Sequence, residues 1–402
     1  MFTPLGVLLA LGLGTHYCLG DSSLEPRTDK VIQCLTAAGV PQALPGTPEF
    51  ATSSSPHNLR LPFTPRAIAL PATVAHVQAA VACGRKNGVK VNARSGGHNY
   101  GSHGIGGEDG HLVIDLKFLN QTIIDSRTQI ATVGPGAKLG NLAIAVGVGG
   151  HVLHGGWGYS THNHGLFLDY LEEVQMVTAN SAVVTASKTQ NPELFWGLRG
   201  AGMSFGIATR FKFRTIPQPP EIQLFYTPFA WNLTQAKAGW QIYQDYVASK
   251  ARPREMNIRV VISSGTFIGT QGTIFLFEGA YHGSKADYEK FIKPFNDPYM
   301  DSLLYANNNA LLFSLPDAEP LESGPDDQIS WLWIVSAIGG PNSAMSNDFP
   351  SQSTSYAHRS SLFLWELGDT VGADAAYPSD VGIPWVNTRH RVFENPQTVG
   401  RR

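Results

Sequence analysis

The stretch Arg94-Ser95-Gly96-Gly97-His98-Asn99-Tyr100 sets a single imidazole in a glycine-rich turn. Valines at helical spacing from Val74 to Val81 precede it, and the alternating segment Val89-Lys90-Val91 predicts a strand that leads into it. Two successive glycines allow backbone N–H groups to approach an anion closely, and such a nest suits the pyrophosphate of a cofactor. We therefore expect His98 to lie where a strand opens into a cofactor-binding loop. The alternative is an ordinary turn with a surface histidine.

Further glycine-containing motifs follow this loop in a fixed order. They are Val133-Gly134-Pro135-Gly136-Ala137, Gly149-Gly150-His151, Gly155-Gly156-Trp157-Gly158-Tyr159-Ser160, Gly165-Leu166-Phe167-Leu168-Asp169, the run from Asn191 to Gly202, and Phe205-Gly206-Ile207-Ala208-Thr209. The succession resembles the FAD-binding domain of the berberine bridge enzyme-like oxidases, within the vanillyl-alcohol oxidase superfamily, and is most similar to the fungal glucooligosaccharide oxidase group. It extends from about Leu61 to Phe213, with weaker marks at Tyr356-Ala357-His358-Arg359 and Asn395-Pro396-Gln397.

The resemblance implies a cofactor site. FAD would be bonded covalently through His98, which raises the reduction potential of the flavin and prevents its loss. Tyr100 would lie beside the substrate, although core packing is an equal alternative for this ring. The cofactor-binding residues implied are Arg94, Ser95, Gly96, Gly97, His98, Gly155, Gly156, Gly158, Ser160, Gly206 and Ile207.

Three features depart from the family pattern. The cysteine that makes a second flavin link in relatives is absent, because the chain passes from Leu139 directly to His151 without the usual helix and loop. The Tyr-x-Asn-Tyr segment that carries the base in relatives is also missing; Tyr377 is nearby but matches no motif, so the catalytic base is not identified. Ser336 stands where oligosaccharide oxidases tend to have an acidic residue.

These features lead us to expect an FAD-dependent oxidase. It would take a hydride from an alcohol or hemiacetal carbon of a small-molecule carbohydrate or secondary metabolite and reduce oxygen to hydrogen peroxide. Ser336 and the missing tyrosine segment favour the metabolite. Two alternatives stay open: a flavin-dependent oxidative cyclase or dehydrogenase of natural-product biosynthesis, and an inactive flavin-free remnant. The two shortened segments indicate either a diverged enzyme or a faulty gene model.

Composition sets the broad class of the chain. With 402 residues, of which 43% are hydrophobic and 15% charged, the chain is long enough for two domains with substantial cores. A net charge of −2 and the lack of basic runs argue against nucleic acid or an anionic membrane as a partner.

The apolar run Leu5 to Leu13, with a cleavage site after Gly20, predicts a signal peptide and a secreted protein, the alternative being a buried N-terminal helix. As in relatives, we expect a monomer.

Secretion gives the remaining cysteines and two asparagines a role. The resemblance implies a disulfide between Cys34 and Cys83, the alternative being two buried free thiols. Asn120 and Asn232 lie in glycosylation acceptor sequences. No metal site is expected. The histidine cluster of His151, His154, His162 and His164 lacks a carboxylate or cysteine to complete a metal set, so we expect cofactor packing and turn hydrogen bonds instead.

The fold class is α+β, with a two-part FAD-binding domain of the vanillyl-alcohol oxidase type and a second domain built on an antiparallel sheet. The prolines at Pro217, Pro219 and Pro220 mark the boundary. We expect a signal peptide at 1–20, the FAD-binding domain at 21–219, the substrate domain at 220–375 and a return to the first domain at 376–402. Predicted strands are Leu112–Leu116, Val174–Ala179, Ala182–Thr185, Ile222–Tyr226, Asn257–Ile262 and Thr273–Tyr281, and predicted helices start at Pro192 or span Trp231–Ala251 and Lys285–Phe291. Core packing is expected for Trp331, Trp333 and Trp365, the alternative being platforms that stack on a sugar, and an ion pair is one role for Arg359.

Overall fold

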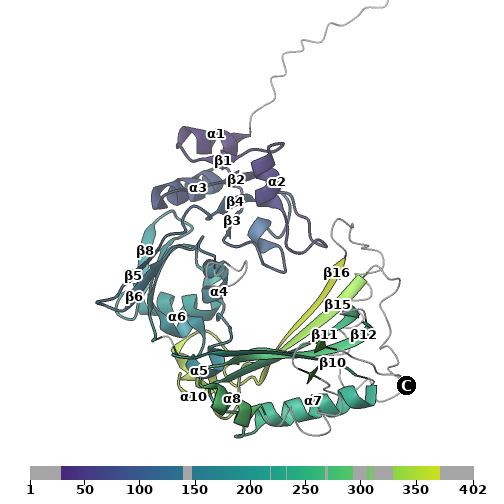
Figure 1. Ribbon diagram of the computed structural model, residues 1–402. Helices are drawn as coiled ribbons and strands as arrows, with labels where there is room; N and C mark the ends of the chain where they lie inside the picture. Colours follow the sequence, from purple (N-terminus) through teal and green to yellow (C-terminus); the bar gives the residue numbers. More distant parts are fainter. Residues whose placement is uncertain are drawn as a thin grey trace, which may run out of the picture.

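The computed structural model describes residues 29–138, 147–217, 219–231, 233–267, 270–292, 306–307, 310–311 and 329–371. Its first unit is a four-stranded sheet in the order β1 (Gln42–Ala43), β2 (Ala67–Ala69), β4 (Leu112–Asp115) and β3 (Val91–Arg94). Helices α1 (Lys30–Ala37) and α3 (Val74–Lys86) cover one face, and α2 (Pro48–Ser54) packs on the other through Phe50 (Figure 1). The fully buried β2 and β4 supply alternate residues to both faces, as expected for a central parallel pair.

The predicted strand Val89–Val91 is wrong in its bounds, because β3 begins only at Val91 and ends at Arg94. The reason is the exit from α3: Gly88 takes a φ of +65°, and the Val89 amide donates back to the carbonyl of Gly84 at 2.9 Å. That hydrogen bond belongs to the end of the helix, so the strand starts later. The shift places His98 four residues beyond the end of β3.

A five-stranded sheet forms the second unit, in the order β5 (Thr122–Asp125), β6 (Ile130–Val133), β9 (Ile207–Arg214), β7 (Leu171–Val177) and β8 (Val183–Ser187). All its strand pairs are antiparallel. Helices α4 (Val148–Leu153) and α6 (Pro192–Ala201) supply side chains to its core. Asn191 precedes α6 and Pro192 is its first residue, as predicted, but the Asn191 side chain donates to the Thr185 carbonyl instead of capping the helix.

The third unit is an antiparallel sheet in the order β10 (Gln223–Ala230), β12 (Thr270–Tyr281), β11 (Met256–Phe267), β15 (Ile329–Ala337) and β16 (Phe363–Val371). Helices α7 (Leu233–Ala248) and α8 (Lys285–Phe291) cover the face turned away from the first two units (Figure 1). Short elements complete the described chain: α5 (Thr161–His164), α10 (Ala344–Asn347), β13 (Ala306–Asn307), β14 (Ala310–Leu311), and the 3-10 turns His103–Ile105, Phe167–Tyr170, Gly202–Ser204 and Ser351–Ser353. The proposed boundary at 219/220 falls between β9 and β10.

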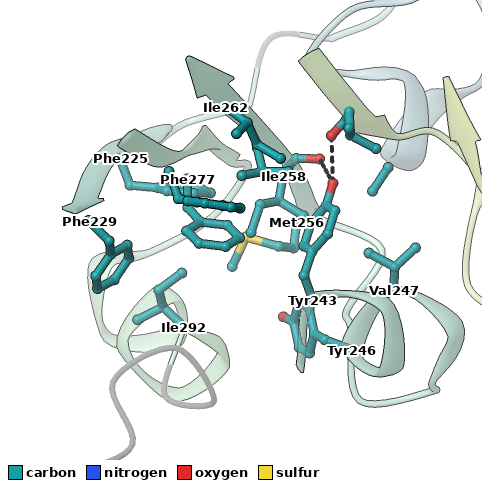
Figure 2. Packing of buried hydrophobic residues seen from close by; sticks show 14 of the residues in the cluster. Phe225, Phe229, Tyr243, Tyr246, Val247, Met256, Ile258, Ile262, Phe277 and Ile292 are labelled. Atoms are coloured by element: carbon teal, nitrogen blue, oxygen red, sulfur yellow. Dashed lines mark hydrogen bonds between the residues drawn. The ribbon is translucent and has the colours of Figure 1, made fainter. Parts of the chain in front are cut away.

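Period-2 alternation decides which residues of this sheet face α7. Phe225, Phe277, Val260 and Val335 pack in the core under α7, where the Tyr243 hydroxyl donates to the Val335 carbonyl at 2.8 Å (Figure 2). The predicted core packing of Trp331 and Trp333 is confirmed. Trp365 is 40% exposed but pairs with Val335 in register and contacts Trp240 of α7, so it too lies on this face. None of these three rings faces the first domain.

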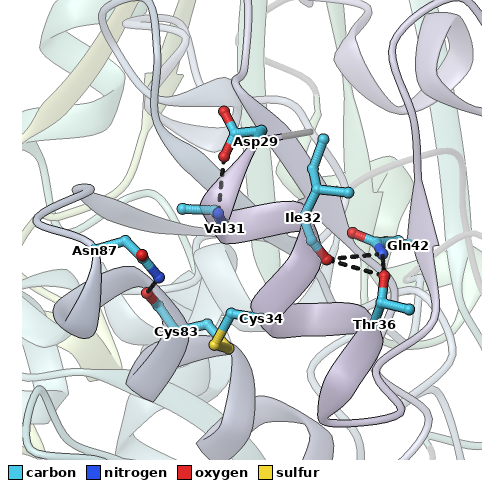
Figure 3. The surroundings of a disulfide bond; sticks show 8 residues. All are labelled: Asp29, Val31, Ile32, Cys34, Thr36, Gln42, Cys83 and Asn87. Carbon is cyan, nitrogen blue, oxygen red and sulfur yellow. Dashed lines mark hydrogen bonds between the residues drawn. A yellow bond between two sulfur atoms is a disulfide. The ribbon is translucent and has the colours of Figure 1, made fainter. Parts of the chain in front are cut away.

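The predicted disulfide is present. Cys34 of α1 and Cys83 of α3 are bonded, with their Cα atoms 5.7 Å apart (Figure 3). The bond closes a loop with a sequence separation of 49 and joins α1 to the helix that precedes the His98 loop.

Two buried arginines fix the third unit to its surroundings. Arg359 forms an ion pair with Asp169, with Nη2–Oδ1 at 2.6 Å and Nη1–Oδ2 at 3.1 Å, so the ion-pair role is confirmed. Arg252 has no carboxylate partner in the part of the chain that the structure describes; its guanidinium donates to the carbonyls of Met256, Ala337 and Gly339 at 2.9–3.1 Å. Burial lowers the pKa of Arg252 to about 10, which still leaves it charged at neutral pH.

Several predictions lie outside the described residues: the signal peptide 1–20, the acceptor Asn232, Tyr377 and the return segment 376–402. Asn120 is described and exposed, which leaves its glycosylation a prediction. Within the described ranges, no helix is long and apolar enough to span a membrane.

Candidate functional site

The His98 loop is shaped by contacts that a larger residue would break. Gly97 has a φ of +79°, and a Cβ there would come within 2.6 Å of the Arg94 guanidinium. Arg94 in turn lies along β3 and pairs with the fully buried Asp115 of β4, with Nη1 and Oδ2 3.3 Å apart. The ion pair ties the loop to the sheet, and Gly97 lets the loop fold back over it.

The amide groups of this loop are available to a ligand. No described residue accepts a hydrogen bond from the main-chain N–H of Gly96, Gly97 or His98. Gly147, two residues before the Gly149-Gly150-His151 motif, approaches this loop closely, because a Cβ on Gly147 would lie 2.2 Å from the Gly96 nitrogen. Three successive unpaired amides backed by a second glycine segment form a nest for an anionic group.

A cavity of about 550 Å³ opens beside this nest. It is lined by residues of the segment from Ala51 to His57 and by Arg94, Gly96, Gly97 and His98. Its volume lies within the range of cofactor and ligand pockets, about 300–1,000 Å³. Four of the five residues of the first motif that were predicted to bind the cofactor therefore line one cavity. The fifth, Ser95, does not, and its hydroxyl donates to the Pro135 carbonyl at 2.5 Å.

The His98 ring has a second histidine against it. Its centroid lies 4.3 Å from that of His57, with the rings tilted by 34°. The pKa of His98 is lowered, first by partial burial and then by the neighbouring charges of His57, Arg94 and Lys138. His98 is therefore neutral at neutral pH, the state in which an imidazole nitrogen can form a bond to carbon.

The second group of predicted residues lies on the loop between α4 and α5. Gly155 and Gly156 have φ values of +126° and +81°, and a Cβ on them would meet the rings or side chains of Tyr356 and Phe167 within 2.9 Å. Gly158 faces open space, and its amide donates to Thr161 at 2.9 Å. Close by, the buried Trp157 Nε1 has no partner among the described residues.

Ser160, Gly206 and Ile207 lie differently. Ser160 is exposed and precedes α5 without capping it. A Cβ on Gly206 would clash with the Val177 carbonyl at 2.4 Å, and Ile207 packs in the hydrophobic core. The contacts of Gly206 and Ile207 are structural ones made to β7, and their role toward the cofactor stays a proposal.

The structure fits an FAD group. The unpaired amides suit its pyrophosphate, the cavity has room for part of its rings, and the Arg94 Nε and Trp157 Nε1 groups are buried donors without partners in the described chain. Unpaired buried donors are rare in folded proteins unless a ligand or water satisfies them. Neither cysteine of the described chain is available for a second link, because Cys34 and Cys83 are bonded to each other.

Tyr100 joins the loop to the third sheet. It is 61% exposed, which overturns the core-packing alternative, and its hydroxyl donates to Glu366 Oε2 of β16 at 3.1 Å. Burial of the hydroxyl, together with the Glu366 carboxylate, raises the pKa of Tyr100 to about 12. This phenol is a proton donor at neutral pH.

The sheet face opposite α7 carries a polar row. Tyr226, Glu278, Arg259 and Ser336 are successive register partners across β10, β12, β11 and β15. Glu278 accepts from Tyr159 at 2.9 Å and from Arg259 Nε at 2.5 Å, so the row reaches the Gly158 loop. The buried Ser336 hydroxyl has no partner among the described residues.

The four clustered histidines are hydrogen-bonded or packed. His162 is buried, and its Nδ1 donates to the Arg254 carbonyl at 2.9 Å, while His164 Nε2 lies 3.1 Å from the Asn163 amide. His151 lies against Phe167 at 6.1 Å, and the His154 ring donates to the Gly150 carbonyl. No group of three potential ligands that could hold a metal ion is found among the described residues.

Sequence reasoning missed His57, Glu366, and the trio Tyr159, Glu278 and Arg259 as site residues. Alternation along β10, β11 and β12 would have placed Tyr226, Arg259 and Glu278 on one face. Nothing in the sequence indicates that His57 contacts His98.

Comparisons with known proteins identify the family of this chain. Residues 65–187 match the family model of an FAD binding domain. A xylooligosaccharide oxidase of Thermothelomyces thermophilus is 37% identical over 89% of this chain and 82% of its own length, and the FAD-linked oxidoreductase dpmaF of Metarhizium anisopliae is 33% identical over 94% and 82%.

A solved structure extends the likeness to the fold. The glucooligosaccharide oxidase of Acremonium strictum with a 6-S-cysteinyl, 8α-N1-histidyl FAD superposes with a TM-score of 0.74 at 30% identity, over 87% of this chain and 84% of that one. The chain thus belongs to the family of FAD-linked oxidoreductases that contains the oligosaccharide oxidases and the berberine bridge enzyme-like proteins.

Proposed function

We propose that this protein holds FAD covalently through His98 and oxidises the hemiacetal carbon of an oligosaccharide, with oxygen reduced to hydrogen peroxide. The observation that carries the proposal is the bridge from the His98 loop to the polar sheet face, made by the hydrogen bond of Tyr100 to Glu366. The substrate, whose carbon gives up the hydride, would lie between that loop and the sheet. The similarity to the xylooligosaccharide oxidase supports a sugar donor.

The described side chains can bind and orient such a donor. The exposed ring of Tyr100 can pack on a sugar face, while Glu366 and Glu278 can accept hydrogen bonds from sugar hydroxyls. When bound, FAD supplies the acceptor for the hydride. Tyr100 keeps its proton and therefore orients the donor without removing the hydroxyl proton. The catalytic base stays unidentified.

Cofactor roles are proposed for the other glycine-motif residues as well: Arg94, Ser95, Gly96, Gly97, Gly155, Gly156, Gly158, Ser160, Gly206 and Ile207. We also propose that the protein is secreted after loss of residues 1–20 and acts as a monomer. The Cys34–Cys83 bond supports secretion, since disulfides persist in oxidising compartments.

Oxidation of a secondary metabolite is the second candidate. Ser336 favours it, because its buried hydroxyl takes the place of the acidic residue of oligosaccharide oxidases and leaves the polar row with one carboxylate, that of Glu278.

One experiment separates these functions. The secreted protein is precipitated in acid, the washed pellet is examined for flavin and for a flavin-bearing His98 peptide, and peroxide is measured with xylo-, cello- and chitooligosaccharides. We expect a yellow pellet and the aldonic acid or lactone as product. A yellow pellet without oxidation of any sugar would favour the metabolite, and a colourless pellet would favour the remnant.

A further inference from the structure

His57 and Tyr100 stack beside the proposed flavin attachment point. The His57 ring contacts both neighbours, with its centroid 4.3 Å from that of His98 and 5.5 Å from that of Tyr100. The next residue, Asn58, donates through Nδ2 to the Tyr100 carbonyl at 2.7 Å. A side-chain hydrogen bond across 42 residues of sequence therefore anchors the His57 segment to the His98 loop.

Both histidines line the same cavity. One side of the His98 ring is thus in contact with another imidazole, and the cavity gives a flavin ring access to it. A ring held by a neighbour on one side loses rotational freedom before the bond forms, which favours a reaction that needs aligned atoms.

Electrostatics acts in the same direction. The charged or titratable groups that face His98 are His57, Arg94 and Lys138, and each disfavours a positive charge on His98.

We infer that His57 is a positioning residue for covalent attachment of FAD: its ring orients the His98 imidazole at the cavity wall. The inference rests on the proposed function, because it requires His98 to be the attachment point. In this step a nitrogen–carbon bond forms between His98 and the 8α carbon of the flavin. One C–H bond of the 8α methyl group and the imidazole N–H bond break, two electrons and two protons pass to the flavin ring, and dioxygen then accepts them as hydrogen peroxide.

The test follows covalent incorporation of added FAD into apo-protein. Wild type, His57→Ala, His57→Phe, His98→Ala and the control His76→Ala are compared; His76 is half-buried in the first turn of α3 and does not line the cavity. The readout is flavin fluorescence in acid-precipitated protein as a function of time and pH. Noncovalent FAD affinity is measured in the His98→Ala background with and without His57→Ala.

Removal of the ring should slow incorporation on the order of 100-fold, the usual cost of misplacing a reacting group by about 1 Å. His57→Phe retains a stacked ring and should recover most of the rate at neutral pH. The acid limb of the pH profile of incorporation by His57→Phe should move to higher pH, because the His57 charge that lowers the pKa of His98 is gone. His76→Ala should match the wild type.

Three results would overturn the inference. The first is a wild-type rate and pH profile in His57→Ala. The second is loss of noncovalent FAD binding in that variant, which would make His57 a binding residue. The third is the absence of covalent flavin at His98 in the wild type. Only this third result would also refute the proposed function, because that function includes attachment of FAD to His98.

Discussion

Replacement of Arg359 by Met tests whether the ion pair with Asp169 holds the third sheet to the first domain. Arg359 follows the 3-10 turn before β16, and Asp169 lies in the Gly165–Asp169 motif of the expected FAD-binding domain. The side chains of Arg359 and Asp169 are only 3% and 1% exposed. The substitution therefore leaves a carboxylate buried without its cation.

The magnitude follows from that burial. Breaking a buried pair by removal of one partner costs about 3–5 kcal/mol. Asp169 keeps one other donor, the Leu166 amide at 2.9 Å, so the cost should fall near the lower end of that range. Arg359→Lys keeps the charge but loses the two-point contact and the hydrogen bond to Thr354, and we expect about half the loss.

The assay is urea unfolding followed by the fluorescence of the eight tryptophans, with the free energy of unfolding obtained by linear extrapolation. The double variant Arg359→Met/Asp169→Leu is the control, because it removes both charges and should recover most of the stability. A single variant within about 1 kcal/mol of wild type, or a double variant as unstable as the sum of the singles, would refute the reasoning.

Three further predictions concern the disulfide, the substrate bridge and pH. Replacing both Cys34 and Cys83 by Ala should lower the free energy of unfolding by about 4 kcal/mol, the loop-closure value for a sequence separation of 49. Denaturant titration with and without reductant checks this value, and equal stability of the variant and the oxidised wild type would contradict it. Tyr100→Phe should raise the KM for an oligosaccharide about 2- to 10-fold with little change in kcat, since it removes one hydrogen bond to Glu366 and keeps the ring. Tyr100→Ala should raise the KM further. Steady-state peroxide assays check both variants, and an unchanged KM in both would show that Tyr100 is not part of the binding site. Burial, and then the charge of Arg252, lowers the pKa of His162 to about 3, so below pH 6.5 the unfolded chain binds a proton that the folded chain does not bind. The free energy of unfolding should therefore be full above pH 6.5 and lower by about 2 kcal/mol at pH 5. Unfolding curves between pH 7 and 5 check this, and His162→Gln should flatten the decline.

The local parts of the site could be predicted from the sequence. The Gly96-Gly97-His98 turn and the glycine segment around Gly156 follow from short motifs whose residues are restricted by backbone geometry, and the disulfide follows from the family resemblance. The predicted helix Lys285–Phe291 is confirmed for the same reason, because Ser284 caps it.

The long-range contacts could not be predicted. Tyr100 and Glu366 are 266 residues apart, and Tyr159 and Glu278 are 119 apart. Alternation fixes the face on which a residue lies, but the pairing of faces from different domains depends on the connections between strands. His57 illustrates the limit, since its ring lies against His98 only because α2 and β3 belong to one sheet unit.

The anchor made by Arg252 has a consequence for the evolution of substrate preference. Its three acceptors are backbone carbonyls, which every amino acid provides, so neighbouring side chains can be exchanged without loss of these hydrogen bonds. Ser336 precedes one of the acceptors, Ala337, and projects into the polar row. The hydrogen bonds that hold this end of β15 therefore do not depend on the side chain at position 336, where the resemblance to the oligosaccharide oxidases implies an acidic residue.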